Sequence, residues 1–116
     1  MAINSTFGVS LSGLTAASTR MQATAHNVAN VNTEGFKAQR TIDTPSSVVG
    51  GGVTTRVEQT TTAGPVSFGD EGELVEQSNV DIANETVQRV VAAGAYEANL
   101  TVVRELSEMD KVLFTL

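Results

Sequence analysis

The sequence predicts a mainly α-helical protein with a small β region, in which long N- and C-terminal helices pack as an antiparallel coiled coil. Two Ala-rich, helix-favouring stretches with narrow apolar seams occupy residues 12–37 and 78–103. Between them the helical period disappears and Thr, Val, Gly, Ser and Pro dominate. Residues 1–40 hold three basic and one acidic residue, and residues 79–116 hold three basic and six acidic residues. This charge difference modestly favours the two ends lying side by side.

These patterns divide the chain into residues 1–37 (first helix and turn), 38–77 (β-rich connecting segment) and 78–116 (second helix). The 116 residues suffice for one small domain. Aromatic residues make up 4% and Trp is absent, so a solitary core would be thin. We therefore expect the apolar seams to need a partner surface.

The first helix is predicted over about residues 4–30. Its seam has alternating spacings of four and three, typical of a coiled coil. Its members are Phe7, Leu11, Leu14, Ser18, Met21, Ala25 and Val28.

A helix stop and a turn follow in NVANVNTEGFK. Asn30 and Asn32 tolerate left-handed backbone, and Gly35 accepts a positive φ without steric cost. The sequence leaves two interpretations of these asparagines open. They are either helix-stop and turn residues, which we favour for each one singly, or groups of an interface.

The middle segment predicts two to four short strands in a small sheet or loose hairpin. Residues 53–59 alternate as a strand does, and three glycines at 50–52 precede them as a turn. An acidic cluster comprises Asp70, Glu71, Glu73 and Glu76. It lacks the ligand spacing of an EF-hand, so we interpret it as a solvated acidic turn.

The second helix is predicted over about residues 81–113. Ser78 and Asn79 are cap-type residues, and Ser78 with Asp81 approximates a capping box. Gly94 lies beside the seam and indicates close approach by a neighbour. Two eleven-residue steps and a heptad predict a nearly straight helix. The seam consists of Val87, Val91, Ala95, Ala98, Val102, Leu106, Met109, Leu113 and Leu116.

Composition argues against an enzyme, and we expect no cofactor or metal. Cysteine is absent and His26 is the single histidine, so a zinc site or a catalytic triad is improbable. We interpret His26 as a polar residue on or beside the seam, and expect the ring of Tyr96 to pack at an interface or in the core. No basic patch predicts nucleic-acid binding, no apolar run is long enough for membrane insertion, and no Sec-type signal peptide is evident.

The terminal stretches resemble the flagellar axial protein family of basal-body rod and hook proteins. The matching N-terminal residues read Ser12-Gly13-Leu14-Thr15-Ala16 and then Ala25-His26-Asn27-Val28-Ala29-Asn30-Val31-Asn32-Thr33-Glu34-Gly35-Phe36-Lys37. The matching C-terminal residues are Ser78-Asn79-Val80-Asp81-Ile82, Glu85, Val87, Tyr96, Ala98 and Asn99. Thr86 stands where the family more often has a larger apolar residue.

This resemblance implies a structural subunit of the basal-body rod, most like a small proximal rod protein because the middle segment is short. Such a subunit is synthesised in the cytoplasm, exported by the flagellar type III apparatus, and assembled in the basal body across the periplasm. Its partners would be other rod and hook proteins and copies of itself, in a polymer or homo-oligomer. The alternative is a soluble coiled-coil adaptor or export chaperone related to flagellar proteins.

On this hypothesis we expect an assembly interface built from the seams, the turn motif and Tyr96. Its candidate residues are Phe7, Leu11, Leu14, Met21, Asn27, Val28, Asn30, Asn32, Gly35, Phe36, Val87, Val91, Tyr96, Val102, Leu106, Met109 and Leu113.

Overall fold

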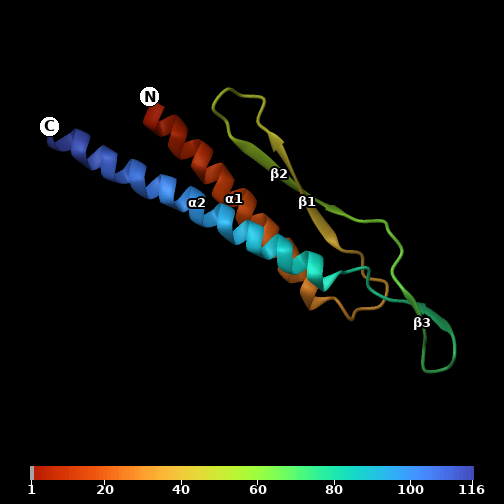
Figure 1. Ribbon diagram of the computed structural model, residues 1–116. Coiled ribbons are helices and arrows are strands. Elements are labelled where there is room, and N and C mark those ends of the chain that lie inside the picture. Colours follow the sequence, from red (N-terminus) through yellow and green to blue (C-terminus); the bar gives the residue numbers. More distant parts are fainter. Residues whose placement is uncertain (1) are drawn as a thin grey trace.

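The computed structural model describes residues 2–116 and shows an elongated molecule built on two long helices (Figure 1). Its principal extents are 76 × 25 × 14 Å and its radius of gyration is 19.6 Å. A compact domain of this length would have a radius of gyration of about 13 Å. The chain is therefore a rod-shaped structure with little interior.

The two helices are α1 (Ala2–Ala29) and α2 (Ile82–Thr115), which lie side by side and run in opposite directions (Figure 1). Two contacts fix their relative register, because Asn27 meets Glu85 and a Cβ on Gly13 would lie 2.7 Å from the Asn99 side chain. At 1.5 Å per residue, α1 is about 42 Å long and α2 about 51 Å. The last turns of α2 consequently extend beyond the first turn of α1 (Figure 1).

The faces that the helices bury against each other are small and polar. On α1, the buried residues Ser10, Ala17 and Thr24 are spaced seven residues apart. On α2, Glu85, Ala92 and Leu106 are buried and Asn99 is half-buried, so these four positions are also spaced seven residues apart. Of the predicted seam of α2, only Ala95 and Leu106 lie on the side that α1 covers, so most of that seam lies outside the contact between the two helices.

The helix ends use side chains of the predicted motifs in different roles. Gly35 has a positive φ of 69°, as predicted. No described residue other than glycine has a positive φ, so the backbone of Asn30 and Asn32 is not left-handed. Asn30 instead donates a side-chain hydrogen bond to the His26 carbonyl, 2.9 Å away. The N-cap of α2 is Asp81, which accepts hydrogen bonds from two backbone N–H groups and replaces the predicted box begun by Ser78.

Four strands lie between the helices, in two separate antiparallel ribbons. β1 (Gln39–Pro45) pairs with β2 (Val53–Gln59), and β3 (Val66–Phe68) pairs with β4 (Leu74–Glu76). The β1–β2 hairpin packs along α1, whereas no other described helix or strand contacts the β3–β4 ribbon (Figure 1). The predicted strand at residues 53–59 is confirmed, and the glycines before it include positive φ values of 75° at Gly50 and 74° at Gly52.

The chain crosses itself closely at Gly64, at the root of the β3–β4 ribbon. Gly64 is buried, and a Cβ built there would lie 1.9 Å from the Gln77 carbonyl oxygen. Because backbone occupies this space, relief requires the two segments to separate. Gly94, in contrast, has nothing within 4 Å of such a Cβ.

We expect Gly64→Ala to destabilise the fold by about 2 kcal/mol or more, since the added methyl overpacks two backbone segments. Gly94→Ala is the matched control. It should stabilise the isolated chain by up to about 1 kcal/mol, because alanine is the better helix former. Urea unfolding followed by circular dichroism measures both, and equal effects of the two substitutions would contradict this account.

Candidate assembly interface

Asn27 joins α1, β1 and α2 at a single buried amide. Its side chain is 1% exposed. The Nδ2 atom donates to the Gln39 carbonyl at 2.8 Å and to Glu85 Oε1 at 3.0 Å, and Oδ1 accepts from the Gln39 N–H at 2.7 Å. The Asn27 amide thus binds the first residue of β1 as a neighbouring strand would.

Asn79 makes a second such junction just before α2. Its Oδ1 accepts from the Ala38 N–H at 2.6 Å, and its Nδ2 donates to Thr60 Oγ1 and to the Thr62 carbonyl, both at 2.8 Å. The Asn79 backbone N–H donates to the Phe36 carbonyl at 3.2 Å. One residue therefore ties together the entry to β1, the exit from β2 and the start of α2.

Glu76 anchors the root of the β3–β4 ribbon. Its carboxylate accepts hydrogen bonds from Lys37 Nζ and, at 3.0 Å, from the Gly64 N–H. Lys37 also donates to the Thr62 carbonyl at 3.2 Å. The Lys37 hydrogen bond, with the Gly64 N–H and the charge of Lys37, holds the pKa of Glu76 below its usual value of 4.5.

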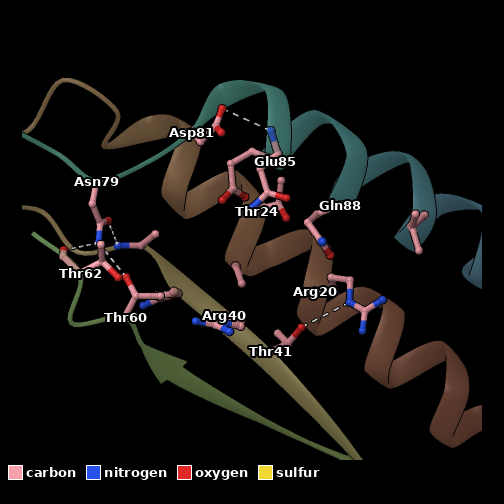
Figure 2. Close-up of a pocket in the computed structure, with 15 residues that line it drawn as sticks. Arg20, Thr24, Arg40, Thr41, Thr60, Thr62, Asn79, Asp81, Glu85 and Gln88 are labelled. Atoms are coloured by element: carbon pink, nitrogen blue, oxygen red, sulfur yellow. Dashed lines mark hydrogen bonds between the residues drawn. The ribbon is translucent and has the colours of Figure 1, made fainter. Parts of the chain in front are cut away.

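A cleft of about 730 Å³ opens between these elements, with α1 as its floor, β1 on one side and α2 on the other (Figure 2). Residues 38–41 line it consecutively, whereas no residue of β2 does. Arg20 bridges its lower end by donating to Thr41 Oγ1 at 3.3 Å and to Asp43 Oδ2 at 2.8 Å. Arg40 is exposed at the rim, and its side chain has no hydrogen bond or ion pair with the described residues.

The cleft contains no arrangement of an activated nucleophile and base. The single histidine, His26, lies exposed on α1 with its ring centroid 5.4 Å from that of Phe36, in an edge-to-face contact. Within residues 2–116, no three His, Asp or Glu side chains are grouped so that they could hold a metal ion. The Asn27, Asn79 and Glu76 side chains each bond backbone segments.

An exposed apolar surface runs along α2 on the side that α1 leaves uncovered. At about 100° per residue these side chains share one face of the helix. They include Val87, Val91, Val102, Met109 and Leu113, each at least 40% exposed. We call this set the α2 stripe.

A second apolar surface lies on α1 and faces away from the β1–β2 hairpin. Ser12 bonds the hairpin through the Val53 N–H at 3.1 Å, and Leu14 lies about 160° around the helix from Ser12. Leu11 is 53% exposed and Val28 is 43% exposed, while Phe7, Leu14 and Met21 are half-buried. These five residues form the α1 stripe.

The two stripes open on opposite sides of the helix pair. Val91 of the α2 stripe lines the cleft, so the α2 stripe faces the side of the hairpin. The α1 stripe faces the other side. Neither stripe can cover the other within one chain.

The other expected interface residues are distributed unevenly. Asn27 and Leu106 are buried within the chain, Asn30 caps α1, and Phe36 is half-buried. Asn32, Gly35 and Tyr96 are exposed. The joining roles of Glu85, Asn79 and the Lys37–Glu76 pair were not predicted from the sequence. The polar residues at the helix boundaries were the available signal, but their partners lie 12 to 58 residues away along the chain.

Neither helix of the described chain combines the length and apolar content that a bilayer crossing requires.

Two family models match the chain, one at each end. Residues 7–37 match the model described as "Flagella basal body rod protein", and residues 72–116 match "Flagellar basal body rod FlgEFG protein C-terminal". Together they cover about two thirds of the chain and include both junction asparagines. A search of curated proteins finds no match.

We expect Asn27→Ala to destabilise the fold by about 2–4 kcal/mol, because it leaves the Gln39 N–H and carbonyl and the Glu85 carboxylate without their partner. Asn27→Asp should be at least as damaging, since it places a second carboxylate beside Glu85. Asn32→Ala is the control at an exposed asparagine and should change the free energy of unfolding by less than about 0.5 kcal/mol. Denaturant unfolding measures the free energy of unfolding of the three variants, and an Asn27→Ala loss no larger than that of Asn32→Ala would contradict the assigned role.

The Glu76 carboxyl should titrate below 4.5 in the folded chain. Because its folded pKa is the lower one, its contribution to stability is present above 4.5 and is lost as the pH falls through the folded value. NMR titration of this carboxyl measures the shift. Lys37→Met should return the midpoint towards 4.5, and an unchanged midpoint in that variant would contradict the assigned cause.

Proposed function

Since the chain belongs to the flagellar basal-body rod and hook protein family, whose members are structural, we propose that it assembles through its terminal helices into the tubular rod of the basal body. In this role it is exported by the flagellar type III apparatus, crosses the periplasm as part of the rod, and contacts other rod and hook proteins and copies of itself. The short middle segment supports a proximal position.

The observation that carries this proposal is the placement of the two apolar stripes. They lie on opposite sides of the helix pair, and in a single chain the α2 stripe is exposed while the α1 stripe is exposed at Leu11 and Val28 and half-buried at its other three residues. The α1 stripe of one subunit is then free to cover the α2 stripe of the next. A contact between two different surfaces repeats without closing, unless the rotation happens to form a ring. Such a contact suits a helical tube.

The chemistry of the buried helix faces supports the same assignment. Within one chain the helices meet through small and polar residues, at seven-residue intervals on both. We propose that this contact is an antiparallel coiled coil with an unusually small-sided seam. Because Val, Leu and Met side chains stay outside it, the gain from burying them is available to contacts between subunits. Assembly would then stabilise each subunit.

We propose that the assembled tube also transmits torque, which the same geometry supports. A helix bends little over 40–50 Å when its neighbours hold it on several sides. The junctions at Asn27 and Asn79 lock the hairpin to the helices, so a subunit would rotate with its neighbours as one body.

The alternative function is a coiled-coil adaptor or export chaperone, favoured by the same exposed stripes. Cell fractionation separates the two functions. A rod subunit co-purifies with hook–basal bodies, whereas an adaptor remains in the cytosol.

We expect Leu11→Asp and Met109→Asp each to abolish polymer formation and motility, because each places a charge on one of the two stripes. Both side chains are exposed, so the fold of the isolated chain should persist. Leu106→Asp is a poorer test, since Leu106 packs between the helices. Ala93→Asp, on an exposed side of α2 away from the α2 stripe, is the control and should leave assembly intact.

Mixing the two stripe variants tests the pairing itself. Leu11→Asp retains an intact α2 stripe and Met109→Asp an intact α1 stripe. Sedimentation should therefore detect mixed dimers that grow no further. Polymers formed by either variant alone would contradict the proposed pairing.

A further inference from the structure

The β3–β4 ribbon projects from the end of the helix pair with an uncovered apolar face (Figure 1). Gly69 and Gln77 each donate a 2.7 Å backbone bond across the ribbon, to Glu73 and Pro65. Bonded and non-bonded pairs alternate in an antiparallel ribbon, so Val66 with Glu76 and Phe68 with Leu74 are the non-hydrogen-bonded pairs. Val66, Phe68 and Leu74 share one face and are 61%, 78% and 70% exposed. A two-stranded ribbon is marginal alone, so this face needs a covering surface.

The same ribbon has an open edge along β3. The backbone groups of Val66 and Phe68 point away from β4, because the bonded pairs lie between them. The outer edge of β4 is partly occupied, since the Gly35 N–H donates to the Glu76 carbonyl at 2.9 Å. An added strand therefore has access to β3.

The cleft beside β1 presents a complementary open edge. Thr60 donates a backbone bond to Ala38 and Ser46 donates one to Gly52, so even-numbered residues of β1 bond β2 and odd-numbered ones face outward. Asn27 already occupies the outward position at Gln39. The outward backbone groups of Thr41 and Asp43 have no bond outside the β1–β2 ladder in the described chain. Such an edge is a template for another strand.

Charge and apolar character match between the two surfaces. The tip of the ribbon carries Asp70, Glu71 and Glu73, and residues 65–76 contain no basic residue. Arg40 lies at the cleft rim, and its guanidinium has no hydrogen bond or ion pair with the described residues. On the opposite wall, Val91 is 50% exposed. The cleft thus offers a strand edge, an Arg40 side chain without a partner among residues 2–116, and one exposed apolar side chain, Val91, on an α2 wall that also carries Asp81, Asn84, Glu85 and Gln88.

We propose that the β3–β4 ribbon of one copy docks in the cleft of a second copy. β3 pairs with the outer edge of β1, Phe68 packs against Val91, and the acidic tip faces Arg40. The ribbon points away from the cleft of its own chain, so the occupant comes from another subunit (Figure 1). This docking rests on the proposed function, because it adds a second contact between subunits that the two helix stripes hold together.

Cross-linking between two different variants tests the docking, and the absence of native cysteine makes the result specific. One protein carries Asp70→Cys at the ribbon tip and the other Gln88→Cys on the α2 wall of the cleft. A short bismaleimide should join the two chains when they are mixed. A single chain that carries both cysteines is the control, because a cross-link within it would mean that the ribbon docks in the cleft of its own chain. Cross-linking within that chain at high dilution would overturn the proposal.

Charge reversal identifies the contact. Adding Glu71→Arg to the Asp70→Cys protein should lower the yield of mixed dimer roughly tenfold at low salt, through repulsion from Arg40. Adding Arg40→Glu to the Gln88→Cys protein should restore the yield. An unchanged yield with the first substitution, or no recovery with the second, would overturn the proposed pairing.

Sedimentation of the same mixtures separates the two proposals. Polymers without any mixed cross-link would leave assembly through the stripes intact and overturn ribbon docking. Monomers throughout would contradict both. If both contacts exist, Arg40→Glu should restore the yield of mixed dimers, and Met109→Asp should abolish the polymers.

Discussion

The structure depends on two asparagine amides, buried at Asn27 and half-buried at Asn79, that hold the β segments to the helices. Asn27 takes both backbone groups of Gln39 and also donates to Glu85 on α2. Asn79 repeats the arrangement with Ala38, Thr60 and Thr62. An amide suits this position because it donates and accepts at once, whereas a carboxylate only accepts. Without these bonds the hairpin would pack on α1 through few apolar side chains.

This way of joining the segments leaves the larger apolar residues for other purposes. A chain with 4% aromatic residues and two long helices has little interior, and the residues between its helices are mainly small or polar. Val, Leu and Met instead form two stripes on opposite sides. The molecule is accordingly elongated, and its apolar surface suits contact with neighbours on both sides, as a subunit of a rod requires.

The β3–β4 ribbon follows the same rule at smaller scale. Its root is fixed by the Lys37–Glu76 pair and by the close approach at Gly64, while its apolar face stays open. Fixing only the root holds the ribbon at the end of the molecule, where its own chain cannot cover it. The anchored root and uncovered face together suit an arm between subunits.

The sequence alone determined the two helices, the β-rich middle segment and the turn at Gly35, because periodicity and glycine conformation are local properties. It also carried the family signature at both ends. It did not determine which side of α2 meets α1, since the apolar pattern marks a stripe but not its partner. The tertiary structure decided that small and polar residues lie between the helices. It also showed that Asn27, Glu85 and Asn79 are internal joints, because their partners are distant in the chain and meet only after folding.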